Sequence, residues 1–335
     1  MVIEITIEGR KIGDHHPCYV IAEAGLNHDG DVDQAKELVT SAKEVGADMV
    51  KFQIYQTPEL CSRSSKSYDL FSSLELSREE WIEVATHAKH AGITFSASVF
   101  GEYGLGLLAE MGCGSIKIAS SDLTYGQLLG AAAKTGMPLV VSTGMSYLGE
   151  IEEALRIIRV NGNPDVALLH CVSNYPTSVE DANLRAMSTM LEAFHVPDGF
   201  SDHTLGDLVP LAAVALGASL IEKHFTLDRG LPGPDHKLSM IPEEFATMIQ
   251  NIRNVEKALG SGLKVPVEKE QLVRKSARRS IVTKHELKAG SIITKEDVQV
   301  ARPGSGLEPA MLDKVLGRKA VRNLPAGTIL TWDDI

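Results

Sequence analysis

Two histidines follow two successive apolar runs and are suited, by residue type and spacing, to hold a divalent metal ion. His203 comes just after the run 199–201, and His224 lies in the run 219–225. If these runs form neighbouring parallel strands, both imidazoles lie at the same edge of a sheet. Two nitrogen ligands without a thiolate leave positions for water and substrate, which suits Mn²⁺ as a Lewis acid, with Mg²⁺ or Co²⁺ as alternatives. A single histidine is more often a hydrogen-bonded core residue, but two at adjacent strand ends favour the metal.

Two lysines lie inside apolar runs, where an unpaired ammonium is costly. Lys51 stands in Val-Lys-Phe-Gln and Lys117 in Ile-Lys-Ile-Ala-Ser. We expect both to point towards a bound anion rather than to snorkel to the surface. Hydroxyls near the ends of the runs favour a site for a carboxylate and a phosphate, and they belong to Ser98, Ser120, Ser142 and Ser201.

A carboxylate, Glu23, ends the first of these apolar runs. At that position it would lie near the metal and serve as a general acid or base. It would equally serve as the ion-pair partner of Lys51 on the next strand. The two roles are compatible, and the sequence does not choose between them.

These residues share one place in a repeating pattern. Eight short apolar runs alternate with segments of helical period over the first 260 residues. The pattern is typical of a (β/α)₈ TIM barrel, in which the C-terminal ends of the strands meet at one mouth and carry the chemistry. The strands are predicted at 19–24, 49–54, 93–98, 115–119, 139–142, 166–171, 199–201 and 219–225.

Boundary signals locate helices at 32–45, 77–90 and 242–259. Ser77 and Glu80 form a capping box at the start of the second, and Pro242 and Gly260 bracket the third. Three further segments are predicted: a hairpin at 3–13 that floors the barrel, a polar connection at 57–73, and a linker at 261–275. The domains are therefore a catalytic barrel at 1–260 and a small domain at 276–335.

The small domain contains an internal repeat. The segment Leu287-Lys-Ala-Gly-Ser-Ile-Ile-Thr294 recurs 37 residues later as Leu324-Pro-Ala-Gly-Thr-Ile-Leu-Thr331, and Asp297 is matched by Asp334. Two copies are too few for a solenoid, so a compact module with internal pseudo-symmetry is predicted. A module of this size is expected to lean on another surface.

Composition excludes several classes of protein. The formal net charge of −11 argues against a nucleic-acid partner, because the phosphate backbone rewards a concentrated positive surface. No apolar stretch is long enough to span a bilayer, and residues 1–7 are unlike a signal peptide. Four cysteines without CxxC spacing suit free thiols in a reducing compartment, so a cytoplasmic enzyme is expected.

The motifs resemble those of the sialic acid synthase family, in the same order and over essentially the whole chain. They are Ile21-Ala-Glu-Ala-Gly-Leu-Asn-His-Asp-Gly30, Lys51-x-Gln53, Lys117-Ile-Ala-Ser120, Ser142-Thr-Gly-Met145, His170-Cys-x-x-x-Tyr-Pro176, Ser201-Asp-His-Thr204, Glu222-Lys-His-Phe-Thr226 and Gly233-Pro-Asp-His-Lys237. The tail, with Arg302-Pro-Gly304, resembles the antifreeze-like (SAF) domain of the same family.

The resemblance implies condensation of phosphoenolpyruvate with the aldehyde of an N-acetylated hexosamine, giving a nine-carbon 2-keto-3-deoxy acid and phosphate. N-acetylmannosamine is the preferred acceptor, and N-acetylneuraminate the product. By motif, phosphoenolpyruvate would be held by Lys51, Ser98, Lys117, Ser120, Ser142 and Ser201. The metal on His203 and His224 would polarise the aldehyde oxygen and then activate water, while Glu23 assists protonation or stabilises the cationic intermediate.

The resemblance also implies a sugar-binding set and an assembly. The sugar-binding set is Gln53, Asp122, Tyr175, Asp235 and Arg302. Because Arg302 lies in the small domain, its role implies a domain-swapped homodimer in which it reaches the barrel of the partner; taken alone, Arg-Pro-Gly is usually an exposed loop. The chain departs from the family pattern at Ser98-Val-Phe100, Asp122, Asn174 and 57–73; all four departures affect substrate binding and bear on the identity of the sugar more than on the reaction.

Other interpretations stay open. The nearest is the same reaction on 2,4-diacetamido-2,4,6-trideoxymannose, leading to N,N'-diacetyllegionaminate; a pseudaminic acid precursor or a 6-phosphorylated sugar is less favoured. A metal-free aldolase with a Schiff base on Lys117 is the alternative enzyme class. A binding protein with a decayed barrel is the non-enzyme alternative.

Overall fold

The structure is a computed structural model, and it describes residues 3–335. The chain divides into two compact units, Met1–Gly260 and Ser261–Ile335, which are described separately. Within the described part of the chain, no helix is long and apolar enough to cross a membrane.

The first unit is a closed barrel of eight parallel strands, as the sequence predicts. The strands follow one another around the barrel in chain order, and the last pairs with the first. They are β3 (Tyr19–Gly25), β4 (Met49–Ile54), β5 (Thr94–Val99), β6 (Ile116–Ile118), β7 (Leu139–Ser142), β8 (Val166–Cys171), β9 (Asp198–Asp202) and β10 (Leu220–His224).

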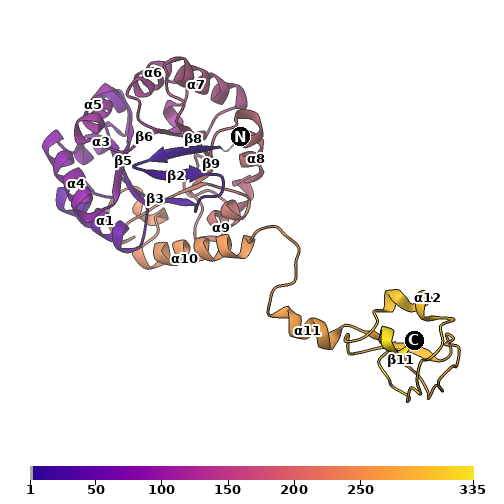
Figure 1. Cartoon of the computed structure of the whole chain (residues 1–335). Helices are drawn as coiled ribbons and strands as arrows, with labels where there is room; N and C mark the ends of the chain where they lie inside the picture. The colour runs from indigo at the N-terminus through magenta and orange to yellow at the C-terminus, as the bar shows by residue number, and fades with distance from the viewer. Residues whose placement is uncertain (1–2) are drawn as a thin grey trace. The chain divides into compact units, whose positions relative to one another are not determined.

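Helices surround this barrel as a ring (Figure 1). Their apolar stripes pack on the outward side chains of the strands, and both belong to one large core. The helices are α1 (Val32–Glu44), α4 (Arg78–Ala91), α5 (Glu102–Met111), α6 (Gly126–Lys134), α7 (Leu148–Val160), α8 (Arg185–Phe194), α9 (Leu208–Ala215) and α10 (Pro242–Leu259). The predicted capping box is present, because Ser77 Oγ accepts from the N–H of Glu80 and the Glu80 carboxylate accepts from the N–H of Ser77.

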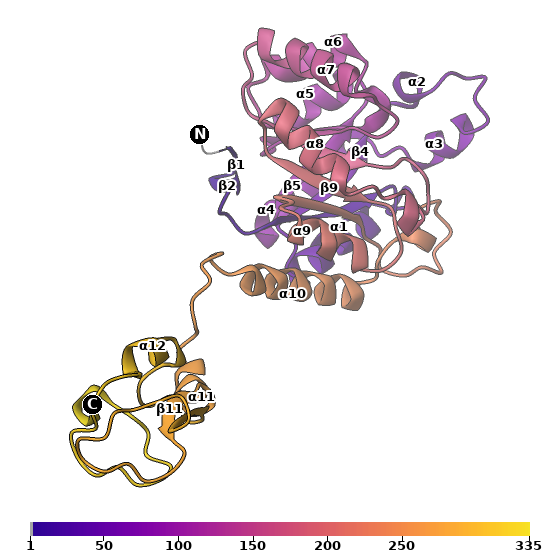
Figure 2. The same cartoon turned by 90° about the vertical axis from the view of Figure 1, so that its right-hand side faces the viewer.

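One end of the barrel is closed by the predicted hairpin of β1 (Glu4–Ile7) and β2 (Arg10–Gly13) (Figure 1). Ile5, Ile7 and Ile12 pack on inward side chains of the strands and form a second core with them. The hairpin and the C-terminal ends of the strands lie at opposite ends of the barrel (Figure 2).

Two details differ from the prediction. Ile93 does not begin β5, because its N–H donates to Ala88 O in the left-handed turn that ends α4 at Gly92. The connection 57–73 is not irregular throughout: it contains α2 (Thr57–Leu60) and most of α3 (Tyr68–Leu74). Both helices lie at the end of the barrel opposite the hairpin (Figure 2).

The second unit has a small core of its own, with strands β11 (Ser280–Thr283) and β12 (Val298–Ala301) and the short helix α12 (Leu312–Val315). Its repeat appears as a near-twofold arrangement, because Leu287 and Leu324 exchange both backbone hydrogen bonds. The same side-chain bond recurs in each copy, Thr294 to Asp297 and Thr331 to Asp334. A helix, α11 (Glu270–Ala277), begins within the predicted linker 261–275.

The two units carry opposite net charge. Residues 1–260 hold 19 Lys and Arg against 35 Asp and Glu, whereas residues 261–335 hold 14 against 9. The barrel is therefore strongly acidic and the small unit is basic.

Candidate active site

Strand periodicity determines which side chains enter the barrel. Alternate residues of a strand face the same side, and Tyr19, Met49, Val140 and Leu220 form the apolar layer inside the barrel. Residues at even spacing from these therefore also point inward, nearer the mouth. Lys51, Ser142 and Glu222 are two residues further along their strands, and Glu23 and His224 are four residues further; together they form a polar layer.

A cavity of about 560 Å³ opens above this layer. Its lining contains twelve of the fourteen side chains that the sequence predicts for the site. They are Glu23, Lys51, Gln53, Ser98, Lys117, Ser120, Ser142, Tyr175, Ser201, His203, His224 and Asp235.

The two lysines form a buried ionic floor with two carboxylates. Lys51 Nζ contacts Glu23 Oε2, donates to Ser98 Oγ at 3.1 Å and lies 3.6 Å from Glu222 Oε2. Lys117 Nζ donates to Ser142 Oγ at 2.7 Å and lies 3.6 Å from Glu222 Oε1. Glu222 thus bridges the two ammonium groups, and Ser201 Oγ donates to it at 2.7 Å.

Burial and these charges shift the carboxylates in opposite directions. Burial raises the pKa of Glu23 to about 7 in spite of the neighbouring Lys51. For Glu222, burial is outweighed by Lys117 and Lys51, which lower its pKa to about 2. Burial also lowers the pKa of Lys117. Glu222 is therefore the permanent counter-charge of the floor, whereas Glu23 can exchange a proton near neutral pH.

His203 and His224 lie side by side, with ring centroids 5.4 Å apart. The Nδ1 of His203 must carry its hydrogen, because its partner at 2.7 Å is the carbonyl oxygen of Val172. Nε2 of His203 therefore keeps a free lone pair, the arrangement usual for a metal-bound imidazole. His224 Nδ1 is buried without a hydrogen-bond partner, and burial lowers the pKa of His224 well below its usual value.

The two imidazoles fit one shared cation. A metal-bound imidazole has its centroid roughly 3.2 Å from the ion, so centroids 5.4 Å apart suit a common ion. Among residues 3–335 no group of three or more His, Cys, Asp or Glu side chains is placed to hold a metal. Water and substrate would have to complete the coordination.

A buried ion pair lies directly outside this pair of histidines. Asp202 and Lys223 alternate with His203 and His224 along their strands, so they face the helices instead of the cavity. Lys223 Nζ contacts the Asp202 carboxylate and the carbonyl oxygen of Thr204, and Thr204 N–H donates to Asp202 at 2.8 Å. The pair holds together the two strand ends that carry the imidazoles.

Three polar side chains surround the entrance: Gln53 and Asp235 of the predicted sugar set, and Glu23, the predicted acid or base. Glu23, Gln53 and Asp235 converge on Gly25, where an added Cβ would lie 3.2 to 3.6 Å from each of their polar ends. The ring of Tyr175 lies 4.1 Å from that of His203. Gly25 itself has a φ of +53°, so only glycine keeps this convergence free of strain.

The other two predicted residues are not in the lining. Asp122 accepts from Ser121 Oγ at 2.6 Å outside the cavity, although Ser121 itself is part of the lining. Its predicted sugar contact therefore stays a prediction. Arg302 is exposed on the second unit, so its reach across a dimer stays a prediction.

The site contains residues that the sequence reasoning missed. Glu222 is the most important, and its place two residues before His224 was the available signal, since both then face the cavity. An apolar wall is also present near the entrance, formed by Leu26, Phe71 and Phe100. Phe71 belongs to α3, which the prediction left as a polar connection.

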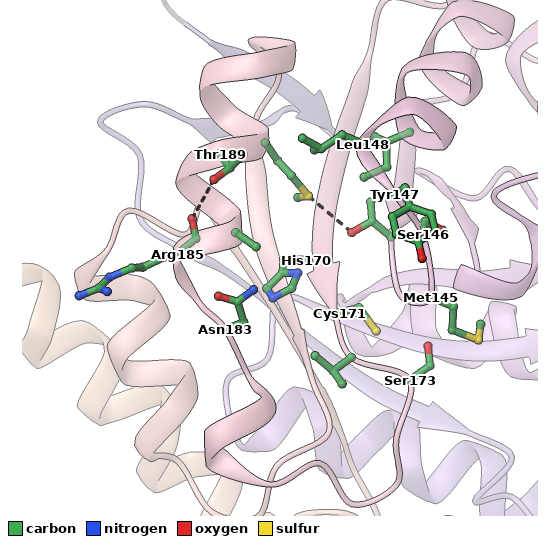
Figure 3. A pocket seen from close by; sticks show the side chains of 15 residues that line it. Met145, Ser146, Tyr147, Leu148, His170, Cys171, Ser173, Asn183, Arg185 and Thr189 are labelled. Carbon is green, nitrogen blue, oxygen red and sulfur yellow. Dashed lines mark hydrogen bonds between the residues drawn. The ribbon is translucent and has the colours of Figure 1, made fainter.

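A second cavity, of about 830 Å³, lies beside the first between α7, β8 and α8 (Figure 3). The two share Met145, Cys171 and Ser173 in their linings. His170 lines only the second cavity, because it alternates with Cys171 along β8. The reacting groups thus belong to the first cavity alone.

Fold and site define the chain as a TIM-barrel enzyme with an ionic floor and a two-histidine centre at its mouth. Comparison with known proteins is specific: residues 38–264 match the NeuB family and residues 278–335 match the SAF domain. The chain therefore belongs to the NeuB family and is a synthase of the sialic acid type with a C-terminal SAF domain.

Individual relatives match over nearly their whole length. An uncharacterized protein of Methanocaldococcus jannaschii is 48% identical over 99% of this chain and 98% of its own. The N,N'-diacetyllegionaminic acid synthase of Legionella pneumophila is 42% identical, with 96% of each chain covered. The crystal structure of N-acetylneuraminic acid synthetase from Leptospira borgpetersenii, in complex with citrate, is 38% identical with a TM-score of 0.77, covering 82% of this chain and 95% of that one.

Proposed function

We propose that the protein condenses phosphoenolpyruvate with the aldehyde of 2,4-diacetamido-2,4,6-trideoxymannose, giving N,N'-diacetyllegionaminate and phosphate. A new C–C bond joins the enol carbon to the aldehyde carbon, water adds to C2, and phosphate leaves by C–O cleavage. The observation that carries the reaction is the pairing of an ionic floor, Lys51 and Lys117, with His203 and His224 in one cavity.

Phosphoenolpyruvate is assigned to the floor. Lys51 and Lys117 supply positive charge in a nearly dry layer, where a charge-assisted hydrogen bond is strong. Hydroxyls that could hold the phosphate and carboxylate oxygens surround them, from Ser98, Ser120, Ser142 and Ser201. Glu222 keeps both ammonium groups oriented when no anion is bound.

The metal is assigned to His203 and His224, with Mn²⁺ preferred over Mg²⁺ and Co²⁺. When bound, it supplies Lewis-acid polarisation of the aldehyde oxygen. The chain itself supplies proton transfer: Glu23, with its pKa raised by burial, lies at the same end of the cavity as His224, its neighbour across the sheet. Asp235 and Gln53 orient the acceptor hydroxyls beside it.

The wall of the entrance supports the proposed acceptor. The diacetamido sugar has two acetyl methyls and a methyl at C6, and Leu26, Phe71 and Phe100 offer apolar surface for such groups. The Legionella relative named for this product is also the more similar of the two named relatives. N-acetylmannosamine, the acceptor preferred from the sequence, carries hydroxyls at C4 and C6, where the diacetamido sugar has an acetamido group and a methyl.

For the assembly we propose a domain-swapped homodimer in which Arg302 completes the sugar site of the partner. Two observations support it: the small unit is basic while the barrel is acidic, and Arg302 forms no ion pair among residues 3–335. We also propose a cytoplasmic location, supported by the four free cysteines.

Phosphate release tests the function. The enzyme, loaded with Mn²⁺, is given phosphoenolpyruvate and one of three acceptors: the diacetamido sugar, N-acetylmannosamine or its 6-phosphate. We expect the highest kcat/KM with the diacetamido sugar. A higher value with N-acetylmannosamine would overturn the acceptor but not the reaction, and no release with any acceptor would overturn the reaction.

Trapping with borohydride separates this function from the aldolase alternative. A Schiff base on Lys117 would be reduced to a stable adduct of increased mass. We expect no adduct with either substrate, and an adduct on Lys117 would contradict the proposed reaction.

A further inference from the structure

The loop 227–239 presents Asp235 to the cavity although no strand positions it. It lies between β10 and α10, and its only regular element is the single turn His236–Leu238. The Asp235 carboxylate makes no side-chain hydrogen bond within residues 3–335, and its Oδ2 lies 3.9 Å from His224 Nδ1. Its direction must therefore be set by its neighbours.

The next residue, His236, points away from the cavity and is completely buried. Its Nδ1 lies 2.6 Å from Thr226 Oγ1, just beyond the end of β10. Its Nε2 lies 3.0 Å from both carboxylate oxygens of Asp29, in the loop after β3. One imidazole thus joins three segments, the ends of two neighbouring strands and the loop itself.

A second set of hydrogen bonds fixes the C-terminal end of the loop. Asn27, also completely buried, donates from Nδ2 to Phe225 O and to Ser239 Oγ, each at 2.9 Å. Ser239 Oγ in turn donates to the backbone oxygen of Asp235 at 2.7 Å. The backbone of Asp235 is consequently held from two directions.

Gly233 shows how tightly the loop covers this arrangement. An added Cβ there would lie 2.2 Å from Asp29 Oδ1 and 2.8 Å from His236 Nε2. The backbone therefore lies directly over the His–Asp contact and keeps water from it, which strengthens the hydrogen bonds.

We propose that Thr226, His236 and Asp29 form a clamp that aims the Asp235 carboxylate at the acceptor sugar. His236 is then a positioning residue for acceptor selection, without contact with either substrate. The inference rests on the proposed function, because it assigns Asp235 to the acceptor rather than to phosphoenolpyruvate.

Two substitutions each remove one of the two side-chain contacts of His236. Asparagine places its polar atoms near the position of histidine Nδ1 and glutamine near that of Nε2, so His236→Asn keeps the Thr226 bond and His236→Gln keeps the Asp29 bond. Misplacement of a binding group by about 1 Å can cost ~100-fold in rate. We expect both variants to raise the acceptor KM about tenfold or more, with the KM for phosphoenolpyruvate changed less than about twofold.

The chain offers a matched control in His87→Ala. His87 Nε2 also contacts a threonine hydroxyl, Thr40 Oγ1, at 2.7 Å, but on the outer helices α1 and α4. Loss of that contact should leave both KM values unchanged. Thermal unfolding of every variant shows whether an effect comes from loss of the fold.

A double-mutant cycle with Asp235→Ala gives the decisive result. If His236 acts through Asp235, then His236→Asn adds less than about twofold to the acceptor KM once Asp235 is gone. Equal effects in both backgrounds, an unchanged acceptor KM, or parallel rises in both KM values would overturn the clamp. Absence of phosphate release from the parent enzyme would instead overturn the proposed function.

Discussion

Removal of the charge on Glu222 is the perturbation that most directly tests the ionic floor. Glu222→Gln keeps the side-chain volume and an oxygen for the bond from Ser201, but leaves Lys117 without a carboxylate partner. Each ammonium lies 3.6 Å from a Glu222 oxygen, where attraction at an effective dielectric of 20 is roughly 4–5 kcal/mol per pair. Part of this attraction offsets the cost of burying the carboxylate.

Removal of one partner from a buried ion pair typically lowers the free energy of unfolding by about 3–5 kcal/mol, and we expect a loss of this size for Glu222→Gln. For a barrel of this size that loss lowers Tm by about 6–10 °C. Phosphoenolpyruvate brings its own negative charges to the same lysines. We therefore expect saturating phosphoenolpyruvate to raise the Tm of the variant by several degrees more than that of the parent.

Thermal unfolding followed by circular dichroism, with and without phosphoenolpyruvate, measures both effects. Glu192→Gln is the matched control, since Glu192 is exposed and forms no ion pair within residues 3–335. An unchanged Tm in Glu222→Gln would refute the bridging role. Equal ligand-induced shifts in variant and parent would refute binding of the anion at the two lysines.

Three further predictions address the proton, the metal and the assembly. Burial raises the pKa of Glu23 in the folded state to about 7 from its ordinary value of 4.5, so between these values the folded state binds a proton that the unfolded state lacks. The free energy of unfolding of the parent should therefore fall relative to that of Glu23→Gln as pH rises from 5 to 7, by up to ~1.4 kcal/mol per pH unit. Urea titrations measure it, and parallel pH dependences of the two proteins would contradict this role. Chelation should abolish phosphate release, and added Mn²⁺ should restore it. In calorimetry His224→Ala should bind Mn²⁺ much more weakly than the parent, with an unchanged circular dichroism spectrum. An affinity like that of the parent would exclude His224 as a metal ligand. Mixed and refolded Arg302→Ala and His224→Ala chains should regain about a quarter of parental activity, because only a swapped heterodimer has one complete barrel; no recovery would place Arg302 in its own barrel.

The barrel could be predicted from the sequence because its strands are buried on both faces. Continuous apolar runs such as Leu139–Ser142 and Val166–Cys171 therefore stand out against the helical segments, and their bounds are confirmed exactly as predicted. Short helices that bury little gave no such signal. The seven-residue α3 buries only Leu74, and the eight-residue α11 buries no residue, so both were missed.

Most side chains that line the cavity could be predicted, and so could the contact of Glu23 with Lys51, but the bridge by Glu222 could not. Strand ends identify which side chains meet, because a closed parallel barrel brings all its C-terminal ends together. Which lysine lies against which carboxylate depends on register and on side-chain length, and the bridge by Glu222 follows from both. The contact of His236 with Asp29 spans 207 residues of chain and appears only in three dimensions.

The division of charge between the units has a consequence for assembly kinetics. A basic module and an acidic barrel attract each other over distances comparable to the Debye length, about 8 Å at physiological ionic strength and about 30 Å at 0.01 M salt. In the proposed dimer, encounter between the small unit of one chain and the barrel of its partner would thus be accelerated in dilute buffer and slowed by added salt. Ionic strength would then be an experimental test of the proposed assembly that acts independently of the chemistry inside the barrel.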